Sequence, residues 1–358
     1  HALLEVQAYR LAHWRVAADE INYRRFFDIN DLAALRMENP QAFDATHELV
    51  LQWISEGRLQ GLRIDHPDGL FDPAAYFRRL QQRAAMALHP QRRPVQADRP
   101  LYLAAEKILV GDERLRDDWP VHGTTGYDFA TLSDALFIDA DGETALDRCY
   151  QDFVGDDPVS GGSYEDEVYA AKRLVMKNLL SSELHVLASE AARIAELDPH
   201  TRDYTLDSLR SALMEVVACF PVYRTYVTEQ GVSTADRNQV LKAVAEARRR
   251  SRMPDRSVFE YVCDLLLTEI AAGKPEPYRE RVLRLAMKFQ QYTSPVTAKG
   301  VEDTAFYRWH RLSSLNEVGG NPERFGLSVD SFHRANIRRQ AHWPHAMLAG
   351  STHDSKRS

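Results

Sequence analysis

Short apolar runs alternate with amphipathic segments along the first third of the chain. Apolar positions recur at helical spacing over residues 11–18 and 42–56, and this spacing predicts a helix in each segment. Asp72 and Pro73 predict the start of another helix, because aspartate caps a helix N-terminus and proline suits the first turn. Strands that alternate with helices indicate a parallel sheet connected by crossover helices.

Three of the apolar runs end in an acidic residue. They cover residues 61–65, 101–106 and 347–354. We expect each run to form a buried strand, so that Asp65, Glu106 and Asp354 lie at strand ends. The carboxyl ends of the strands of a (β/α)8 barrel converge on one mouth, where such barrels carry their active sites. The three acids therefore predict a barrel enzyme.

The middle of the chain has a different pattern, with long amphipathic helices and few candidate strands. The clearest predicted helix runs from residue 164 to about residue 197, and its apolar face favours a core position over a partner-binding surface. The predicted fold class is α/β, a partial (β/α)8 TIM barrel with a large, mostly α-helical insertion. The predicted segments are a barrel part at 1–134 (strand four near 61–65, strand five near 101–106), the helical insertion at 135–290, and a return to the barrel at 291–358 with strand seven near 347–354. We expect the barrel to be incomplete at both ends.

Composition and charge narrow the possible partners. The formal net charge of −7 gives no electrostatic footprint for nucleic acid. No apolar stretch reaches the roughly 20 residues of a membrane span, and the N-terminus lacks a secretory-signal pattern, so we expect a cytoplasmic protein without a membrane partner. We interpret Cys149, Cys219 and Cys263 as buried small hydrophobes in a reducing compartment rather than as thiol nucleophiles. No spacing indicates a zinc site, and we expect no metal or other cofactor.

Cleavage of a glycosidic bond with retention of the anomeric configuration requires two carboxyl groups. One is the nucleophile and the other the proton donor, about 5 to 5.5 Å apart, and Asp65 and Glu106 on adjacent strands are expected to meet that separation. Arg63 lies two positions before Asp65 on the same strand face, so its guanidinium can hold that carboxylate ionised. Glu106 must instead carry a proton, which burial or the negative charges of Asp65 and Asp354 would favour.

His353 and Asp354 are candidates to bind the hydroxyl groups of the transferred sugar, with Asp354 favouring the distorted, positively charged ring. Each motif taken singly has an ordinary structural interpretation: Arg-x-Asp as a surface ion pair, Glu-Lys as a surface dipeptide, and His-Asp as a turn cap. Their joint order, each at a strand end, favours a catalytic interpretation.

At these positions the chain resembles the α-amylase superfamily, glycoside hydrolase family 13. Its signature regions are Gly-x-Arg-x-Asp on strand four, Glu on strand five and His-Asp on strand seven, which match residues 61–65, Glu106 and residues 353–354. The resemblance implies that Asp65 is the nucleophile, Glu106 the acid/base and Asp354 the transition-state stabiliser. Arg63 and His353 match the supporting pair of the superfamily.

Further blocks resemble one subgroup of that superfamily, which rearranges glucans rather than hydrolysing them. These blocks are residues 19–28, 63–70, 123–129, 297–308, 314–320 and 343–358. The subgroup cuts the α-1,4 bond at the reducing end of a maltooligosaccharide, retains the freed glucose and rejoins it through an α,α-1,1 linkage. The resemblance also implies a trehalose-releasing hydrolase as the partner enzyme in the pathway.

Such a reaction needs a closed acceptor pocket, because water competes with the retained glucose for the glycosyl-enzyme intermediate. His66 and Asp68, just beyond Asp65, are candidates to hydrogen-bond that glucose. Weaker candidates for sugar contacts are Tyr127, Lys299 and Glu302, and Trp119 is a candidate for stacking on a glucose ring. Each has an alternative interpretation, as a loop-structuring residue or, for the tryptophan, as a core residue.

Three alternative functions stay open from the sequence. The same acids would serve an amylase-like or glucosidase-like hydrolase if water reached the intermediate. A non-catalytic glycan-binding or helical scaffold protein is another possibility, although it would not need all three acids. The chain could also be an inactive fragment, because the first superfamily region, an Asp followed by Asn-His, is not found.

Overall fold

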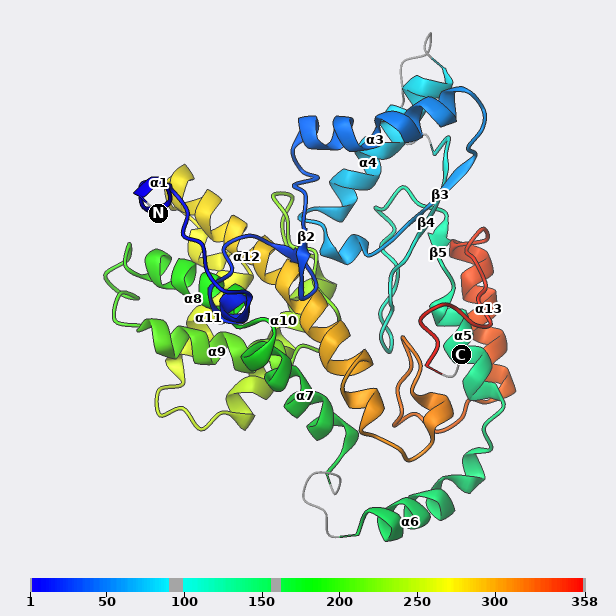
Figure 1. Ribbon diagram of the computed structural model, residues 1–358. Coiled ribbons are helices and arrows are strands. Elements are labelled where there is room, and N and C mark those ends of the chain that lie inside the picture. Colours follow the sequence, from blue (N-terminus) through cyan, green and yellow to red (C-terminus); the bar gives the residue numbers. More distant parts are fainter. Residues whose placement is uncertain (1, 90–98, 156–161, 357–358) are drawn as a thin grey trace.

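The computed structural model describes residues 2–89, 99–155 and 162–356. Figure 1 shows a large helical body beside a smaller region built on a short three-stranded sheet. Within the described residues, no helix is long and apolar enough to cross a membrane. Of the three cysteines expected to be buried, only Cys263 is, whereas Cys219 is partly buried and Cys149 is exposed.

The sheet is parallel and has the order β3, β4, β5. Its strands are β3 (Gly61–Ile64), β4 (Tyr102–Ala105) and β5 (Gly123–Thr124). The register pairs Gly61 with Tyr102 and Ile64 with Ala105, so β3 and β4 end level with each other. Helix α4 (Pro73–Leu88) connects these two strands, which is the crossover expected from the alternating pattern.

The helices on this sheet begin close to where the sequence predicts. Helix α3 (Pro40–Ser55) covers the predicted segment 42–56, and Phe43 and Ile54 from its apolar face are buried. Asp72 Oδ1 accepts the Ala75 N–H at 2.9 Å, which confirms the predicted cap of α4. The helix predicted over 11–18 is wrong, because the segment forms only the 3₁₀ turn η1 (Trp14–Val16) and the start of α2 (Ala17–Glu20).

Six longer helices form the helical body. They are α7 (Tyr164–Asn178), α8 (Ser181–Ala195), α9 (Leu206–Ala218), α10 (Thr234–Arg250), α11 (Ser257–Leu266) and α12 (Glu276–Thr297). The single helix predicted from 164 to about 197 is therefore interrupted, between α7 and α8. Leu180 is buried at this break and its carbonyl accepts the Tyr292 hydroxyl at 2.9 Å. Tertiary hydrogen bonds thus satisfy the backbone that the interruption exposes.

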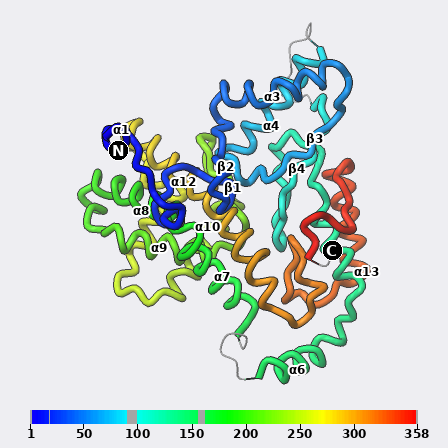
Figure 2. Tube along the Cα trace, in the orientation of Figure 1, coloured from blue at the N-terminus to red at the C-terminus, as the bar shows by residue number. Residues whose placement is uncertain are grey.

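The chain before α3 crosses the helical body, as the blue segment of Figure 2 shows. It begins with α1 (Ala2–Glu5) and continues, after α2, to an antiparallel hairpin of β1 (Arg25–Phe26) and β2 (Ile29–Ala33). Arg25 is buried and binds Glu183 of α8 at 2.9 Å and the carbonyl of Leu179 at 2.9 Å. The hairpin is therefore anchored to the helical body.

The remaining longer helices are α5 (Tyr127–Leu136), α6 (Glu143–Val154) and α13 (Val329–His342). Figure 1 shows α5 and α13 together near β5, whereas α6 lies farther from the sheet. The strand predicted near 347–354 is wrong, since this segment is irregular in the described structure. It nevertheless runs beside β5, where Met347 N donates to Thr124 O at 3.1 Å. A Cβ atom at Gly123 would lie 2.5 Å from Ala346 Cβ, so glycine permits this close approach.

Short 3₁₀ turns complete the described structure: η2 (Pro67–Gly69), η3 (Ala140–Gly142), η4 (Glu269–Ala271), η6 (Ala305–Tyr307) and η7 (Ser313–Leu315).

Candidate active site

Asp65 and Glu106 lie at the carboxyl ends of two adjacent parallel strands. Ile64 and Ala105 end β3 and β4 in register, and each acid follows directly. Glu106 N donates to Ile64 O at 2.9 Å, and His66 N donates to the Glu106 side chain (Oε2) at 2.8 Å. Because His66 directly follows Asp65, the second contact places the Glu106 carboxyl beside the backbone of the residue next to Asp65. The structure thus brings together the two acids that the motifs indicate.

Arg63 and Asp65 form the ion pair expected from their shared strand face. Arg63 Nη1 lies 2.6 Å from Asp65 Oδ1, and the Asp65 side chain is 56% exposed. The charge-assisted hydrogen bond orients the carboxylate, as a nucleophile requires. The exposure leaves that carboxylate open to a ligand.

Burial raises the pKa of Glu106 to about 8. The negative charge of Asp65 raises it further, whereas the His66 N–H that binds the carboxylate lowers it. Burial is therefore the main cause of the raised pKa, and the negative charge of Asp65, which the sequence predicts to be nearby, contributes less. A carboxyl group with this pKa is largely protonated at neutral pH and can donate a proton.

Tyr127 connects Asp354 to the region of the other two acids. It begins α5, is buried, and donates its hydroxyl to Asp354 Oδ2 at 2.5 Å. The same hydroxyl interacts electrostatically with Glu106. His353 Nε2 lies 3.5 Å from Asp354 Oδ2, and its side chain is 69% exposed. The Tyr127 hydroxyl thus binds the carboxylate of Asp354, whereas the sequence predicts that it contacts the sugar.

We expect Tyr127→Phe to lower kcat/KM by about tenfold, because a hydrogen bond to a charged group contributes about 1.5–3 kcal/mol. The loss would leave Asp354 less firmly oriented while the backbone of α5 stays in place. The measurement is turnover, by the complete protein, of the maltooligosaccharide substrate that the sequence resemblance implies. Tyr102→Phe is the matched control, since Tyr102 Oη bonds His345 O at 2.8 Å in the same terminal segment without touching an acid. An equal loss in both variants would contradict the assignment.

A π-helical turn at the end of α12 carries two more predicted residues. It spans Ala298–Glu302, and π-turns inside helices are frequent at functional sites. Lys299 Nζ lies 3.4 Å from Asp28 of the hairpin and 3.0 Å from Asp303. Burial raises the pKa of Glu302 to about 7, and its carboxylate accepts the Tyr223 hydroxyl.

His66 adopts a left-handed backbone conformation, with φ of 45° and ψ of 49°. Its ring lies 4.6 Å from that of Phe27, a hairpin residue that also has positive φ. A Cβ atom at Gly69 would lie 2.5 Å from His66 Cδ2, so the ring packs directly on that glycine. Burial lowers the pKa of His66 to about 4, and the imidazole is therefore neutral near pH 7.

Two predicted substrate contacts are corrected by the structure. Trp119 is 0% exposed and packs between Phe77 and Tyr226, with ring centroids 5.1 and 5.2 Å away, so it is a core residue without a free stacking face. Asp68 is 4% exposed, and its carboxylate is bound by Tyr226 and Lys107 instead of being open to a sugar.

Sequence reasoning missed several residues that shape this region. Lys107, Tyr223, Tyr226 and Phe27 all contact predicted site residues. For Lys107 the signal was present, since it directly follows Glu106. The other three come from segments distant in sequence, and only the packing of the hairpin and the helical body brings them close.

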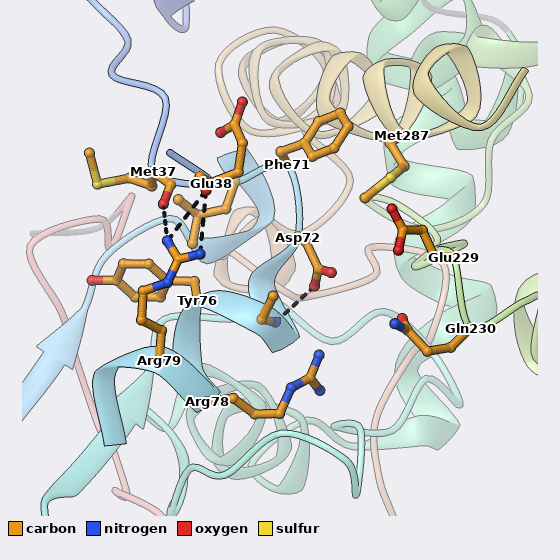
Figure 3. Close-up of a pocket in the computed structure, with 12 residues that line it drawn as sticks. Met37, Glu38, Phe71, Asp72, Tyr76, Arg78, Arg79, Glu229, Gln230 and Met287 are labelled. Carbon is orange, nitrogen blue, oxygen red and sulfur yellow. Dashed lines mark hydrogen bonds between the residues drawn. The ribbon is translucent and has the colours of Figure 1, made fainter. Parts of the chain in front are cut away.

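A separate cavity of about 280 Å³ contains none of the predicted site residues. It is drawn in Figure 3, between the start of α4, residues 37–38 and residues 229–230. The guanidinium of Arg79 donates there to the carbonyls of Met37 and Glu38 and so stabilises the backbone at residues 37–38. Among the residues that the structure describes, no group of histidine, cysteine or acidic side chains is arranged to hold a metal ion.

Comparison with known proteins agrees with the motifs. No family model matches the sequence. Two curated relatives from Mycobacterium tuberculosis, strains CDC 1551 / Oshkosh and ATCC 25618 / H37Rv, provisionally carry the name maltooligosyl trehalose synthase and are 33% identical over 356 residues, or 99% of this chain. The solved maltooligosyltrehalose synthase of Arthrobacter ramosus is 35% identical, with a TM-score of 0.80 over 99% of this chain. The chain is homologous to the maltooligosyl trehalose synthases.

The match covers nearly all of this chain but only part of each maltooligosyl trehalose synthase. The chain spans 40% of the length of the curated relatives and of the Arthrobacter ramosus protein. A structure titled as a hypothetical maltooligosyl trehalose synthase from Sulfolobus tokodaii is 30% identical, with a TM-score of 0.71, 99% of this chain covered and 40% of that one. The resemblance inferred from the sequence blocks is thereby confirmed.

Proposed function

We propose that the protein carrying this sequence is an intramolecular transglucosylase. It converts the reducing-end α-1,4-linked glucose of a maltooligosaccharide to an α,α-1,1 linkage and so forms a maltooligosyl trehalose. The observation that carries the proposal is the buried Glu106 carboxyl, with a pKa of about 8, held by the His66 N–H beside the ionised Asp65–Arg63 pair. The homology to maltooligosyl trehalose synthases supports the same conclusion.

In the first half-reaction, Glu106 gives its proton to the glycosidic oxygen while an Asp65 oxygen attacks the anomeric carbon. The bond to the terminal glucose breaks, and a glycosyl ester with Asp65 forms. Positive charge develops on the sugar ring in the transition state, and we assign its stabilisation to Asp354, whose carboxylate accepts the Tyr127 hydroxyl. His353 and Arg63 act as the supporting pair.

In the second half-reaction, the retained glucose turns so that its own anomeric hydroxyl faces the ester. Glu106, now a carboxylate, takes the hydroxyl proton, and the glucose oxygen attacks the anomeric carbon and releases Asp65. Two successive displacements preserve the α configuration. Neither step needs a cofactor, because the two carboxyl groups supply the nucleophile and the proton.

The acceptor glucose must be retained long enough to react before water does. We assign its binding to His66, Lys299 and Glu302. His66 contacts the ring of the hairpin residue Phe27 at 4.6 Å, Lys299 Nζ lies 5.3 Å from that ring, and Glu302 belongs to the same π-helical turn as Lys299. A neutral imidazole and a cationic lysine together offer hydrogen bonds of both kinds to sugar hydroxyls.

We also propose that the sheet is part of a barrel. We regard β3, β4 and β5 as consecutive strands of a (β/α)8 barrel, supported by their parallel order and by the crossover helix α4. The division at 1–134, 135–290 and 291–358, the cytoplasmic location and the trehalose-releasing partner enzyme stay predictions from the sequence.

The deciding experiment incubates the complete protein with maltopentaose. We expect reducing ends to disappear while the number of glucose units per chain stays at five, because the reducing end is consumed by the new linkage. New reducing ends and shorter products would establish a hydrolase instead. Binding of maltopentaose without any product would establish a glycan-binding protein.

A further inference from the structure

Lys107 directly follows Glu106 and is buried beneath the loops that carry the two acids. Its side chain is 2% exposed, and its Nζ atom lies 3.2 Å from Asp68 Oδ2 and 3.0 Å from Glu113 Oε1. Nζ also donates to Ile108 O at 2.8 Å. We call Asp68, Lys107 and Glu113 the lysine triad. An ammonium group enclosed in this way cannot touch a sugar, so any effect on the reaction acts through the protein.

The lysine triad joins the loop after β3 to the loop after β4. Asp68 lies three residues beyond Asp65, and Lys107 lies one residue beyond Glu106. Two shorter contacts cross between the same loops, from Glu106 N to Ile64 O and from His66 N to Glu106 Oε2. The two loops are therefore connected at three successive levels: by the backbone at Ile64, by the His66 N–H, and by the Asp68–Lys107 ion pair. The ion pair is the farthest of the three from the strands.

Buried hydrogen bonds fix the Asp68 end of the triad. Tyr226 Oη donates to Asp68 Oδ1 at 2.5 Å, so both carboxylate oxygens are occupied. Arg224, also buried, donates to Asp68 O at 2.8 Å and to Leu70 O at 2.6 Å. A buried polar network with its members satisfied is rigid, because displacing either charge would leave the other unpaired in a medium of low dielectric constant.

We infer that the lysine triad holds Asp65 and Glu106 at their working separation, with Lys107 as a positioning residue. The inference rests on the proposed function, because that reaction requires the two carboxyl groups to stand about 5 to 5.5 Å apart. Displacement of a reacting group by about 1 Å can cost about 10²-fold in rate. A rigid tie between the two strand-end loops keeps the acids within that tolerance.

The test compares Lys107→Met with the wild-type complete protein, using maltopentaose. Methionine keeps an unbranched apolar stem like that of lysine but removes the ammonium group and its charge. We expect kcat to fall by about 10²-fold, because the two acids lose their fixed separation. KM is expected to change by less than about threefold, because the groups that bind the sugar are not altered.

Two further variants separate positioning from general destabilisation. Glu215→Gln breaks the Arg173–Glu215 ion pair between α7 and α9, whose side chains are 27% and 9% exposed, and should lower the melting temperature but keep kcat within about twofold. The double variant Asp68→Asn/Lys107→Met leaves Glu113 as the single unpaired carboxylate of the triad, whereas Lys107→Met leaves both Asp68 and Glu113 unpaired. We expect it to melt at a higher temperature than Lys107→Met, with kcat still about 10²-fold below wild type.

Each outcome is decisive for one claim. A wild-type kcat in the double variant would overturn the inference, because the protein would then position its acids without the ion pair. An equal fall of kcat in Glu215→Gln would also overturn it, because stability alone would explain the loss. Failure of the wild-type protein to consume reducing ends would refute the proposed function, whatever the variants do.

Discussion

Asp65→Asn is expected to lower kcat on maltopentaose by on the order of 10⁴-fold or more, as removal of a covalent nucleophile does in other enzymes. The amide cannot form the glycosyl ester, although it fills the same space and can still accept a hydrogen bond from Arg63. Maltooligosaccharide binding should persist, because the other residues that we assign to sugar binding are unchanged. The measurements are the rate of reducing-end loss and the Kd for maltopentaose.

Asp112→Asn is the matched control for this variant. Asp112 lies in the segment after Glu106, its side chain is fully exposed, and its nearest cationic atom is 4.0 Å away on Arg324. We expect its kcat to equal that of the wild type. Appreciable residual turnover in Asp65→Asn would remove that residue from the nucleophile role.

Glu106→Gln is expected to lower kcat by about 10³-fold, within the range that general acid catalysis contributes. The wild-type protein should also show a matching pH dependence. Glu106 must be protonated to start the reaction, and its pKa is raised to about 8, so the active form is present at neutral pH and is lost as pH rises through 8. We expect kcat/KM to fall about tenfold per pH unit above that value.

The pH profile of the variant tests the assignment. In Glu106→Gln the fall near pH 8 should disappear, because glutamine does not titrate. Glu302→Gln is the control, since burial raises the pKa of Glu302 to about 7 and our proposal gives this group a role in binding glucose and not in proton transfer. A fall that persists in Glu106→Gln and vanishes in Glu302→Gln would transfer the acid role to Glu302.

Local sequence was sufficient wherever the determining contacts are local. The cap of α4 at Asp72 involves residues three apart, and the Arg63–Asp65 pair follows from the period of a strand. The neighbourhood of Asp65 and Glu106 also followed, because adjacent parallel strands bring their carboxyl ends to one edge. These predictions needed only short-range rules and one rule of topology.

Predictions failed where distant segments decide the conformation. The helix over 164–197 has a continuous apolar face, but its break at Leu180 is fixed by Tyr292 more than a hundred residues later. Trp119 lies in a loop of the sequence, yet Phe77 and Tyr226 enclose it. Asp68 lies just beyond the candidate nucleophile Asp65 and is therefore predicted to bind sugar, whereas its buried partners could not be predicted from the sequence.

The anchoring of the hairpin by Arg25 has a consequence for protein engineering. Glu183 and the carbonyl of Leu179, about 150 residues away, hold the hairpin that presents Phe27 to His66. The helical body and the hairpin therefore form one transplantable unit, although the strand-bearing segment separates them along the chain. A chimera that exchanges the helical body between relatives should exchange residues 25–33 with it, or the donor body will meet a hairpin whose anchor it did not evolve to bind.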